Sequence, residues 1–495
     1  MTTIAGVDYE AVIGLEVHSQ LLTRSKMFCA CASGYQDAPP NTVVCEVCMG
    51  MPGAMPVVNE KAVEMVIATG LALSCKIAEY TKFDRKNYPY PDLMKGYQIS
   101  QYDWPIAYEG RLAFDVEGAI KTVRITRVHL EEDVAKLMHR DDGVERYSLL
   151  DVNRAGVPLM EIVSEPDMRS AEEARAYLTT IRSILRYIGA STANMEEGSF
   201  RCDANVSIRP RGAEDLGTKV EVKNMNSFRS VYNAIEYEIK RQSRMMAEGS
   251  RIVQETRGWV EGRGVTVSQR SKEYASDYRY FPEPDLPPIA IDREWARRVE
   301  QGLPELPEAR KTRFVTDYGL PAADAQLLVS SKAAADLFDS VVSAGQMAGD
   351  ALRKRAKLAG NWITGELTRL LNAEGVAIED KQVEPAHVVE LLDMIDAGRL
   401  STSMARSVFE EMYNTGGSPG EIAEQAGMSQ ISDADEVQAA VDKAVSENPQ
   451  PVADYLGGKE NAMRFLVGQV MKATRGKANP QVAFELVREK LESMR

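Results

Sequence analysis

A carboxylate and an imidazole near the amino terminus are spaced so that they could bind a metal ion together. Apolar and polar residues alternate over residues 12–18, which is typical of a half-buried β-strand. Glu16 and His18 are two residues apart and therefore project from the same face of that strand. Their side chains suit a divalent cation, and a solvated strand face is the alternative.

Four of the six cysteines follow, with Cys29 and Cys31 as one pair and Cys45 and Cys48 as the second. A segment containing glycine, proline and asparagine separates the pairs and would let the chain double back. Four converging thiolates suit a structural tetrahedral zinc site. Two disulfides or unmetallated thiols are the alternatives, and disulfides are disfavoured because nothing marks the chain as secreted.

Later segments repeat the strand pattern with one apolar and one polar face. In residues 127–131, Val128 and Leu130 are expected to point into the core, so Glu131 lies on the opposite, polar face. Residues 200–209 are apolar at every second position, which places Arg201 and Asp203 together on the other face.

Two more segments add charged groups. Lys223 lies on the polar face of residues 219–223, whereas Glu161 stands inside the apolar run 158–163, where a buried carboxylate needs a partner. Strands that each present carboxylates, arginine and lysine on one face predict a mainly antiparallel sheet with a polar site on that face.

Residues 82–101 are rich in cations, tyrosines and amides, and their two prolines and one glycine predict a loop. Guanidinium, ammonium and phenol groups together suit phosphates or nucleotide bases, and a solvated polar loop is the alternative. Arg85, Lys86 and Lys95 are the candidates for binding phosphate or a substrate carboxylate, and Tyr88, Tyr90 and Gln98 are the candidates for binding a nucleotide such as adenosine.

These polar faces favour ATP chemistry. Mg²⁺ binds through a few carboxylates and substrate phosphates, and arginine and lysine offset the charge of phosphoryl transfer. Glu16, His18 and Glu131 are the expected Mg²⁺ ligands, with Glu161 and Asp203 as further acidic members. The sequence has neither the P-loop nor the Gly-x-Gly-x-x-Gly fingerprint, which excludes those two nucleotide sites.

The remaining pattern predicts the fold class α+β. Helices are expected from Asn59, from the capping box at Ser170, and over residues 227–248, and the chain is helical almost throughout after the prolines at 282–288. We expect an amino-terminal domain with a mainly antiparallel sheet and flanking helices, then an all-α domain and a small all-α tail. Their expected ranges are 1–291, 292–411 and 412–495.

The charge and hydropathy of the sequence indicate which partners and which cellular compartment to expect. The net charge of −14 requires any nucleic-acid contact to use a local basic patch. Residues 459–495 carry a net charge of +4, so Arg475 and Lys477, beside the predicted last helix, are the expected RNA contacts; a solvated hairpin is the alternative. Because the sequence has neither a long apolar run nor an amino terminus that resembles a signal peptide, we expect a cytoplasmic protein.

Several long motifs, in one order along almost the whole chain, resemble the GatB family, which forms the B subunit of aspartyl/glutamyl-tRNA amidotransferase. The motifs are Gly14-Leu15-Glu16-Val17-His18, the stretch 82–101, His129-Leu130-Glu131-Glu132-Asp133, Arg201-Cys202-Asp203-Ala204-Asn205 and the stretch 277–285 from Asp277 to Asp285. Their number makes the resemblance far more specific than one short pattern.

The resemblance implies that the amino-terminal domain is the cradle domain of a ligase. This domain would use ATP and Mg²⁺ to phosphorylate the side-chain carboxylate of glutamate or aspartate mischarged on tRNA(Gln) or tRNA(Asn). Ammonia then displaces the phosphate. It also implies two partners, an amidase (A) subunit that releases ammonia from glutamine and a small (C) subunit. The sequence alone does not decide which of the two charged tRNAs is accepted.

Two other classes of protein are compatible with the sequence. A non-catalytic tRNA adaptor would use the zinc site and the basic tail to position RNA. A metal-dependent phosphodiesterase would use the acids to cleave RNA and would need no ammonia.

Overall fold

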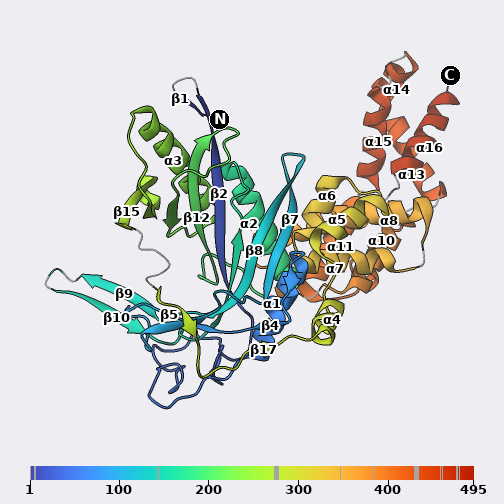
Figure 1. Ribbon diagram of the computed structural model, residues 1–495. Coiled ribbons are helices and arrows are strands. Elements are labelled where there is room, and N and C mark those ends of the chain that lie inside the picture. The colour runs from blue at the N-terminus through green and yellow to red at the C-terminus, as the bar shows by residue number, and fades with distance from the viewer. Residues whose placement is uncertain are drawn as a thin grey trace. The chain divides into compact units, whose positions relative to one another are not determined.

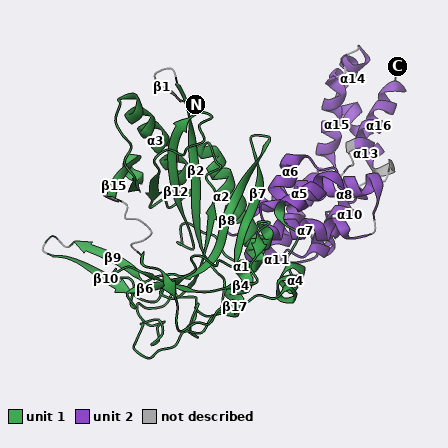
Figure 2. Ribbon diagram, viewed as in Figure 1, with its two compact units in different colours: residues 1–307 green, residues 308–495 purple. Residues whose placement is uncertain are grey.

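The computed structural model describes residues 2–4, 7–141, 143, 145–271, 278–345, 347–381, 383–428, 434–457, 459, 461–474, 478 and 480–494. They form two compact units, residues 1–307 and 308–495 (Figure 2), which are described separately. Arg475 and Lys477, the expected RNA contacts, lie outside the described residues.

A ten-stranded sheet forms the centre of the first unit (Figure 1). Its strands are β1 (Thr2–Ile4), β2 (Val7–Gln20), β3 (Lys76–Ile77), β7 (Ala107–Val116), β8 (Ala119–Glu132), β11 (Pro158–Ser164), β12 (Phe200–Pro210), β13 (Val220–Lys223), β14 (Glu255–Val260) and β15 (Val265–Ser271). The strand order is β15-β14-β13-β12-β2-β11-β8-β7-β3, and β1 pairs with β2. Among the described strands, neighbours are antiparallel except β13 and β14, which are parallel.

Three helices cover one face of this sheet: α1 (Glu60–Ala72) packs on β8, α2 (Ala171–Tyr187) on β7 and α3 (Phe228–Ala247) on β12. Each begins where the sequence predicts it, because a side-chain oxygen of the residue before the helix accepts a hydrogen bond from the first turn. The capping residues are Asn59, Ser170 and Ser227. A further helix, α4 (Arg293–Gln301), packs against α1.

Strand β2 has one apolar, buried face and one polar face, as the alternation of residues in the sequence predicts. Ile13, Leu15 and Val17 are fully buried in the core shared with the helices. Glu16 and His18 are half-buried on the opposite face. The helix-covered face thus stabilises the sheet, and the other face carries the polar side chains.

Residues 82–101 correct one expectation, because they are not simply a loop. They form an antiparallel pair, β5 (Asp84–Asn87) and β6 (Tyr97–Ser100), and β16 (Phe281–Pro282) extends this pair to a three-stranded sheet. The loop expectation was wrong because the prolines and the glycine fall between the strands, in residues 88–96, and leave the flanking backbone free to pair.

Two smaller strand pairs complete the first unit. They are β4 (Tyr80–Thr81) with β17 (Ile289–Ala290), and the hairpin of β9 (Lys136–Asp141) with β10 (Arg146–Asp151), which extends away from the large sheet (Figure 1).

The named secondary-structure elements among the described residues of the second unit are all helices. Its helices are α5 (Pro307–Thr316), α6 (Ala322–Val329), α7 (Lys332–Ser343), α8 (Gly349–Asn361), α9 (Thr368–Glu374), α10 (Pro385–Asp396), α11 (Thr402–Thr415), α12 (Pro419–Gln425), α13 (Ala434–Glu447), α14 (Pro449–Leu456), α15 (Asn461–Ala473) and α16 (Pro480–Glu492). A π-helical segment, Trp362–Leu367, joins α8 to α9. Helices α13 to α16 enclose an apolar core of their own, which includes Val441, Leu466 and Val487.

The expected fold class is confirmed: a mixed, mostly antiparallel sheet with helices precedes a long all-helical region. The three-domain division remains a prediction, and the boundary between the two units falls at Pro307. Within the described part of the chain, no helix combines the length and the apolar character needed to cross a membrane.

Candidate active site and metal centre

Glu161 occupies the middle of a row of three side chains on the polar face of the sheet. It lies opposite His18 in the pairing of β11 with β2, and opposite His129 in the pairing of β11 with β8. Its Oε2 atom is 3.6 Å from His18 Nε2 and 3.3 Å from His129 Nε2. These imidazoles are the partners that a carboxylate in an apolar run requires.

Glu131 joins this row through His18. Glu131 Oε1 lies 3.6 Å from His18 Nε2, and the Ser100 hydroxyl, on β6, is 3.4 Å from Glu131 Oε2. Potential ligand atoms of His18, Glu131 and Glu161 all lie within 4.8 Å of one another. This group, called the histidine–glutamate group below, could hold one divalent cation.

The charge of Glu161 depends on its histidine neighbours. Burial alone would raise the pKa of Glu161, but His129, His18 and Lys86 outweigh it and hold that pKa well below its usual value. The site therefore favours an ionised carboxylate in the middle of the row.

Glu16 lies in a second, neighbouring group rather than in the first. It faces Asp203 across β2 and β12, and ligand atoms of Glu16, Asp203 and Glu221 lie within 4.8 Å of one another. This set is called the acidic group below. Asn205 donates a 2.9 Å hydrogen bond to Glu16 Oε1, and Thr256 donates one of 2.8 Å to Glu221.

Lys223 places a cation beside the acidic group. Its ammonium pairs with Asp203 and lies 3.6 Å from Glu221 Oε1. Burial opposes the charge of Lys223, but Asp203 and Glu221 outweigh it and raise the pKa of the ammonium. Lys223 is therefore positioned to offset negative charge at this face.

Arg201, the other cation predicted from these strands, is held by Asp133. Arg201 Nη2 lies 3.0 Å from Asp133 Oδ2, and Gln20 donates a 2.7 Å hydrogen bond to the same oxygen. Asp133 is 2% exposed, and its partner Arg154 Nε lies 3.6 Å from Oδ1. The positive charge of Arg201 is therefore partly neutralised by Asp133.

Some candidates in residues 82–101 form ion pairs or hydrogen bonds with other parts of the chain. Arg85 forms a two-pronged pair with Glu283, with both N–O distances 2.7 Å. Lys95 pairs with Glu132, and Gln98 donates a 2.8 Å hydrogen bond to the Glu132 carbonyl.

Lys86 is a cation of this segment whose charge interacts with two members of the histidine–glutamate group, Glu131 and Glu161. Its ammonium lies 5.9 Å from the Tyr88 ring and 5.1 Å from the Tyr278 ring. Although burial opposes the charge, Glu131 and other negative groups, Glu161 among them, raise the pKa of Lys86. The Tyr90 side chain, by contrast, is exposed.

Three site residues were not among the candidates: His129, Asp133 and Glu221. His129 and Asp133 stand in a motif of the family resemblance, and Glu221 shares the polar face of residues 219–223. The alternation of faces along each strand could have identified His129 and Glu221 as candidate site residues. Which residues they contact, however, depends on the strand order of the sheet.

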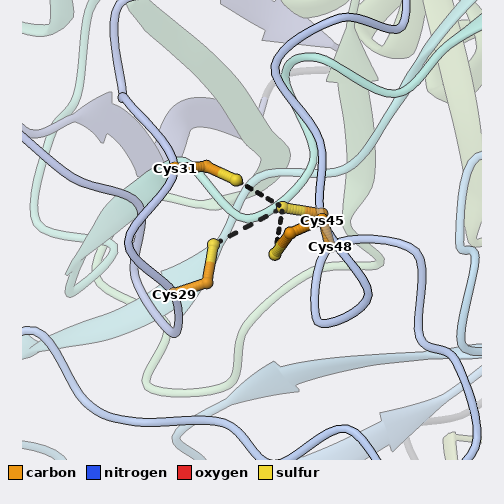
Figure 3. Close-up of side chains that lie close together, drawn as sticks. All are labelled: Cys29, Cys31, Cys45 and Cys48. Carbon is orange, nitrogen blue, oxygen red and sulfur yellow. Dashed lines mark hydrogen bonds between the residues drawn. The ribbon is translucent and has the colours of Figure 1, made fainter.

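The four cysteines lie together at one point of the first unit, with their side chains directed toward one another (Figure 3). Cys48 Sγ lies 3.5 Å from Cys29 Sγ, 3.8 Å from Cys31 Sγ and 3.7 Å from Cys45 Sγ. All four are free thiols, which excludes the expected alternative of two disulfides in this structure. Sulfurs about 2.3 Å from a tetrahedral ion would be separated by about 3.8 Å, so the cluster fits zinc.

A buried lysine supports the cysteine cluster. Lys26 is 0% exposed, and its ammonium donates to Cys48 Sγ at 3.4 Å and to the Val43 carbonyl at 2.8 Å. A hydrogen bond from Cys29, aided by the charge of Lys26, lowers the pKa of Cys48 to about 4. The cluster therefore favours at least one thiolate.

Comparisons with known proteins cover both units. Residues 11–297 match the family model described as the GatB/GatE catalytic domain, and residues 336–491 match the GatB domain. A Dehalococcoides mccartyi protein, named as the B subunit of aspartyl/glutamyl-tRNA(Asn/Gln) amidotransferase, is 54% identical over 487 residues. The proteins of that name from Carboxydothermus hydrogenoformans and Thermomicrobium roseum are both 52% identical, over 485 and 486 residues.

Each of these alignments covers 98% of this chain and 99% of the relative. The first family model also spans both of the metal-ligand groups on the sheet and all four clustered cysteines. The chain therefore belongs to the GatB family.

Proposed function

We propose that this protein is the subunit of a tRNA-dependent amidotransferase that activates aspartate or glutamate mischarged on tRNA, so that Asn-tRNA(Asn) or Gln-tRNA(Gln) is formed. The observation that carries the chemistry is the polar face of the sheet, where His18, Glu131 and Glu161 meet beside the acidic group. This face lies within the part of the chain that matches the catalytic domain of the family.

The reaction needs activation because a carboxylate is a poor electrophile and its oxygen a poor leaving group. A side-chain carboxylate oxygen attacks the terminal phosphorus of ATP, and ADP leaves. Ammonia then attacks the acyl carbon of the resulting acyl phosphate, a proton is lost, and inorganic phosphate leaves with the former carboxylate oxygen. The amide product remains esterified to the tRNA.

The donor atoms on the polar face fit Mg²⁺. Glu16, His18 and Glu131 are the ligands expected from the sequence, and the structure favours His18 and Glu131 with Glu161, and Glu16 with Asp203 and Glu221. Bound Mg²⁺ would offset the negative charge of the ATP phosphates.

Other residues of the chain would offset phosphate charge or hold the metal ligands in place. Lys86, which interacts with Glu131 and Glu161, and Lys223, which interacts with Asp203 and Glu221, would offset phosphate charge. Asn205 and Thr256 hold the carboxylates of Glu16 and Glu221 in place. His129 holds Glu161 in the middle of its row. Tyr88, Tyr90 and Gln98 remain proposals for the adenosine or aminoacyl end.

We assign zinc to Cys29, Cys31, Cys45 and Cys48, with a structural role. Four thiolate ligands fill a tetrahedral ion and leave no open position for chemistry. The support is the convergence of four free thiols at separations of 3.5 to 3.8 Å around Cys48.

The partners follow from the ammonia that the second step consumes. The amidase (A) subunit would release it from glutamine, and the small (C) subunit would hold the pair together. Because the substrates are charged tRNAs, we place the complex in the cytoplasm. Arg475 and Lys477 remain proposed contacts to tRNA phosphates, supported by the net charge of +4 of residues 459–495.

The decisive test is ADP formation on mischarged tRNA by the complete complex with both partner subunits. The proposed function predicts ADP production that requires the mischarged tRNA, followed by glutamine-dependent amide formation. Tight tRNA binding without ADP would instead support a non-catalytic adaptor, and shortened tRNA would support a phosphodiesterase. Either result would contradict the proposal.

A further inference from the structure

Exposed aromatic rings gather on the segments around β5, β6 and β16. Four of them are each 45% to 53% exposed: Tyr90, Tyr102, Trp104 and Phe281. Two cations lie beside the rings, each ion-paired with carboxylates of the protein: Lys82 Nζ is 5.9 Å from the Trp104 ring centre and pairs with Asp84 and Asp103, and the Arg85 guanidinium is 5.8 Å from that of Phe281 and pairs with Glu283. Accessible rings interleaved with cations are typical of surfaces that bind single-stranded nucleic acid.

Two of the tyrosines in this region form a stacked pair. The ring centres of Tyr102 and Tyr280 are 4.4 Å apart, and the ring planes differ by 12°. Tyr280 covers one face of the Tyr102 ring, while the Tyr102 residue remains 47% exposed. A planar base could therefore continue the stack on the accessible side of Tyr102.

The stacked pair is held in place by the backbone around it. The Tyr102 N–H donates a 3.1 Å hydrogen bond to the buried carboxylate of Asp84. Tyr280 directly precedes β16, in which Phe281 pairs with Arg85 of β5. Such a preformed platform loses little conformational entropy when a base binds.

The platform adjoins the histidine–glutamate group. Ser100, two residues before Tyr102, has its hydroxyl 3.4 Å from Glu131 Oε2, and the intervening Gln101 accepts a hydrogen bond from the Leu130 N–H. Burial and the charges of Glu131 and Glu161 raise the pKa of Tyr280 to about 12. Tyr102 therefore follows directly on a segment that contacts the histidine–glutamate group, and its side chain reaches the protein surface.

We propose that Tyr102, backed by Tyr280, stacks on the 3′-terminal adenine of the charged tRNA. This inference rests on the proposed function, because the reacting amino acid is esterified to the terminal ribose and its adenine must lie close to the acids. The adenine of ATP has the same ring. We assign the platform to tRNA because exposed aromatic rings extend beyond Tyr102 to Tyr90, Trp104 and Phe281, which matches a strand of nucleotides better than one mononucleotide.

The test uses the complete complex and a charged tRNA whose terminal adenine is replaced by 2-aminopurine, a base whose fluorescence falls when it stacks. Wild-type protein and Tyr102→Phe should quench the fluorescence. Tyr102→Ala should remove most of the quenching and weaken tRNA binding about tenfold, within the range for the loss of one base–aromatic stack. The KM for ATP should not change.

Tyr147→Ala is the matched control, because Tyr147 is also 47% exposed but lies on β10. It should leave the quenching intact. Normal quenching by Tyr102→Ala would overturn the inference, and so would a raised KM for ATP alone, which would assign the platform to ATP. Loss of a partner subunit from the purified complex would make the surface a protein interface and would also overturn it.

Failure of this inference can be distinguished from failure of the proposed function. If the wild-type complex forms ADP on mischarged tRNA while Tyr102→Ala quenches normally, only the stacking platform is wrong. If the wild-type complex forms no ADP, the proposed function itself is wrong.

Discussion

His18 and Glu161 lie directly opposite each other in the antiparallel pairing of β2 with β11, with Nε2 and Oε2 3.6 Å apart. The two residues are 143 positions apart in the sequence, so this relationship depends on the strand order of the sheet. It places the carboxylate of the apolar run 158–163 beside an imidazole from the strand that carries Glu16.

Replacing Glu161 by Gln should reduce ADP formation on mischarged tRNA at least about 100-fold, because the change removes a charge from a proposed Mg²⁺ ligand while keeping the side-chain volume. The measurement is single-turnover ADP release by the complete complex. Glu165→Gln is the control, since Glu165 accepts a hydrogen bond from Thr126 outside both metal-ligand groups. Normal ADP release by Glu161→Gln, with assembly intact, would remove Glu161 from the reaction centre.

Strand parity predicted the composition of the polar face but not its pairing. Residues two apart share a face, which was enough to place Glu16 with His18 and to choose Glu131 over Glu132. Cross-strand neighbours depend on which distant strands pair and in what register. Parity therefore did not predict that Glu16 would lie nearer to Asp203 than to Glu131.

The segment 82–101 shows a second limit of sequence reasoning. Its composition indicated binding groups, yet Arg85 pairs with Glu283, which is 198 residues away. A charged side chain looks the same in the sequence whether its partner is a ligand or a remote part of the fold. The helices were easier to predict, because a cap such as Ser170 and an apolar stripe are local features.

Lys26→Met should weaken zinc binding while leaving most of the fold intact. The ammonium is buried and lies 3.4 Å from Cys48 Sγ, so its charge offsets that of the thiolates, whereas methionine keeps much of the volume. Loss of a supporting interaction around a metal ligand typically lowers affinity about 10- to 100-fold. The measurement is zinc release to a chelator followed by elemental analysis.

Two variants calibrate the zinc measurement. Cys48→Ser should lose zinc almost completely, and Cys75→Ala should retain it, since Cys75 is buried outside the cluster. Purified wild-type protein without zinc would contradict the metal assignment, whereas zinc retention by Lys26→Met at wild-type strength would contradict only the role of Lys26.

Asp133→Asn should lower the free energy of unfolding by about 3 kcal/mol near neutral pH, because it leaves Arg201 and Arg154 beside a buried neutral amide. Burial opposes the charge of Asp133, but these arginines hold its pKa below the usual value. A carboxyl whose pKa is lowered by folding stabilises the protein above its unfolded pKa of about 3.9, and this contribution is lost as the pH falls through the lowered pKa.

The difference between wild type and Asp133→Asn should consequently be constant from about pH 8 to pH 5 and shrink below about pH 4. Urea-unfolding midpoints across this range provide the measurement. Asp141→Asn is the control, since Asp141 forms an exposed pair with Arg146 and should change stability by less than about 1 kcal/mol. A difference that grew on acidification would show that Asp133 is not the stabilising anion.

Replacing both Arg475 and Lys477 by Ala should raise the KM for charged tRNA and leave the KM for ATP unchanged. Residues 459–495 carry a net charge of +4 in a chain of net charge −14, so phosphate contacts from this region would release counterions. Loss of two such contacts should reduce the slope of log binding constant against log salt concentration by about 2. Lys443→Ala is the control, because Lys443 is the lysine of the acidic residues 411–458. If the double variant kept both the wild-type KM and the wild-type salt slope, the tRNA contact would have to lie elsewhere on the protein.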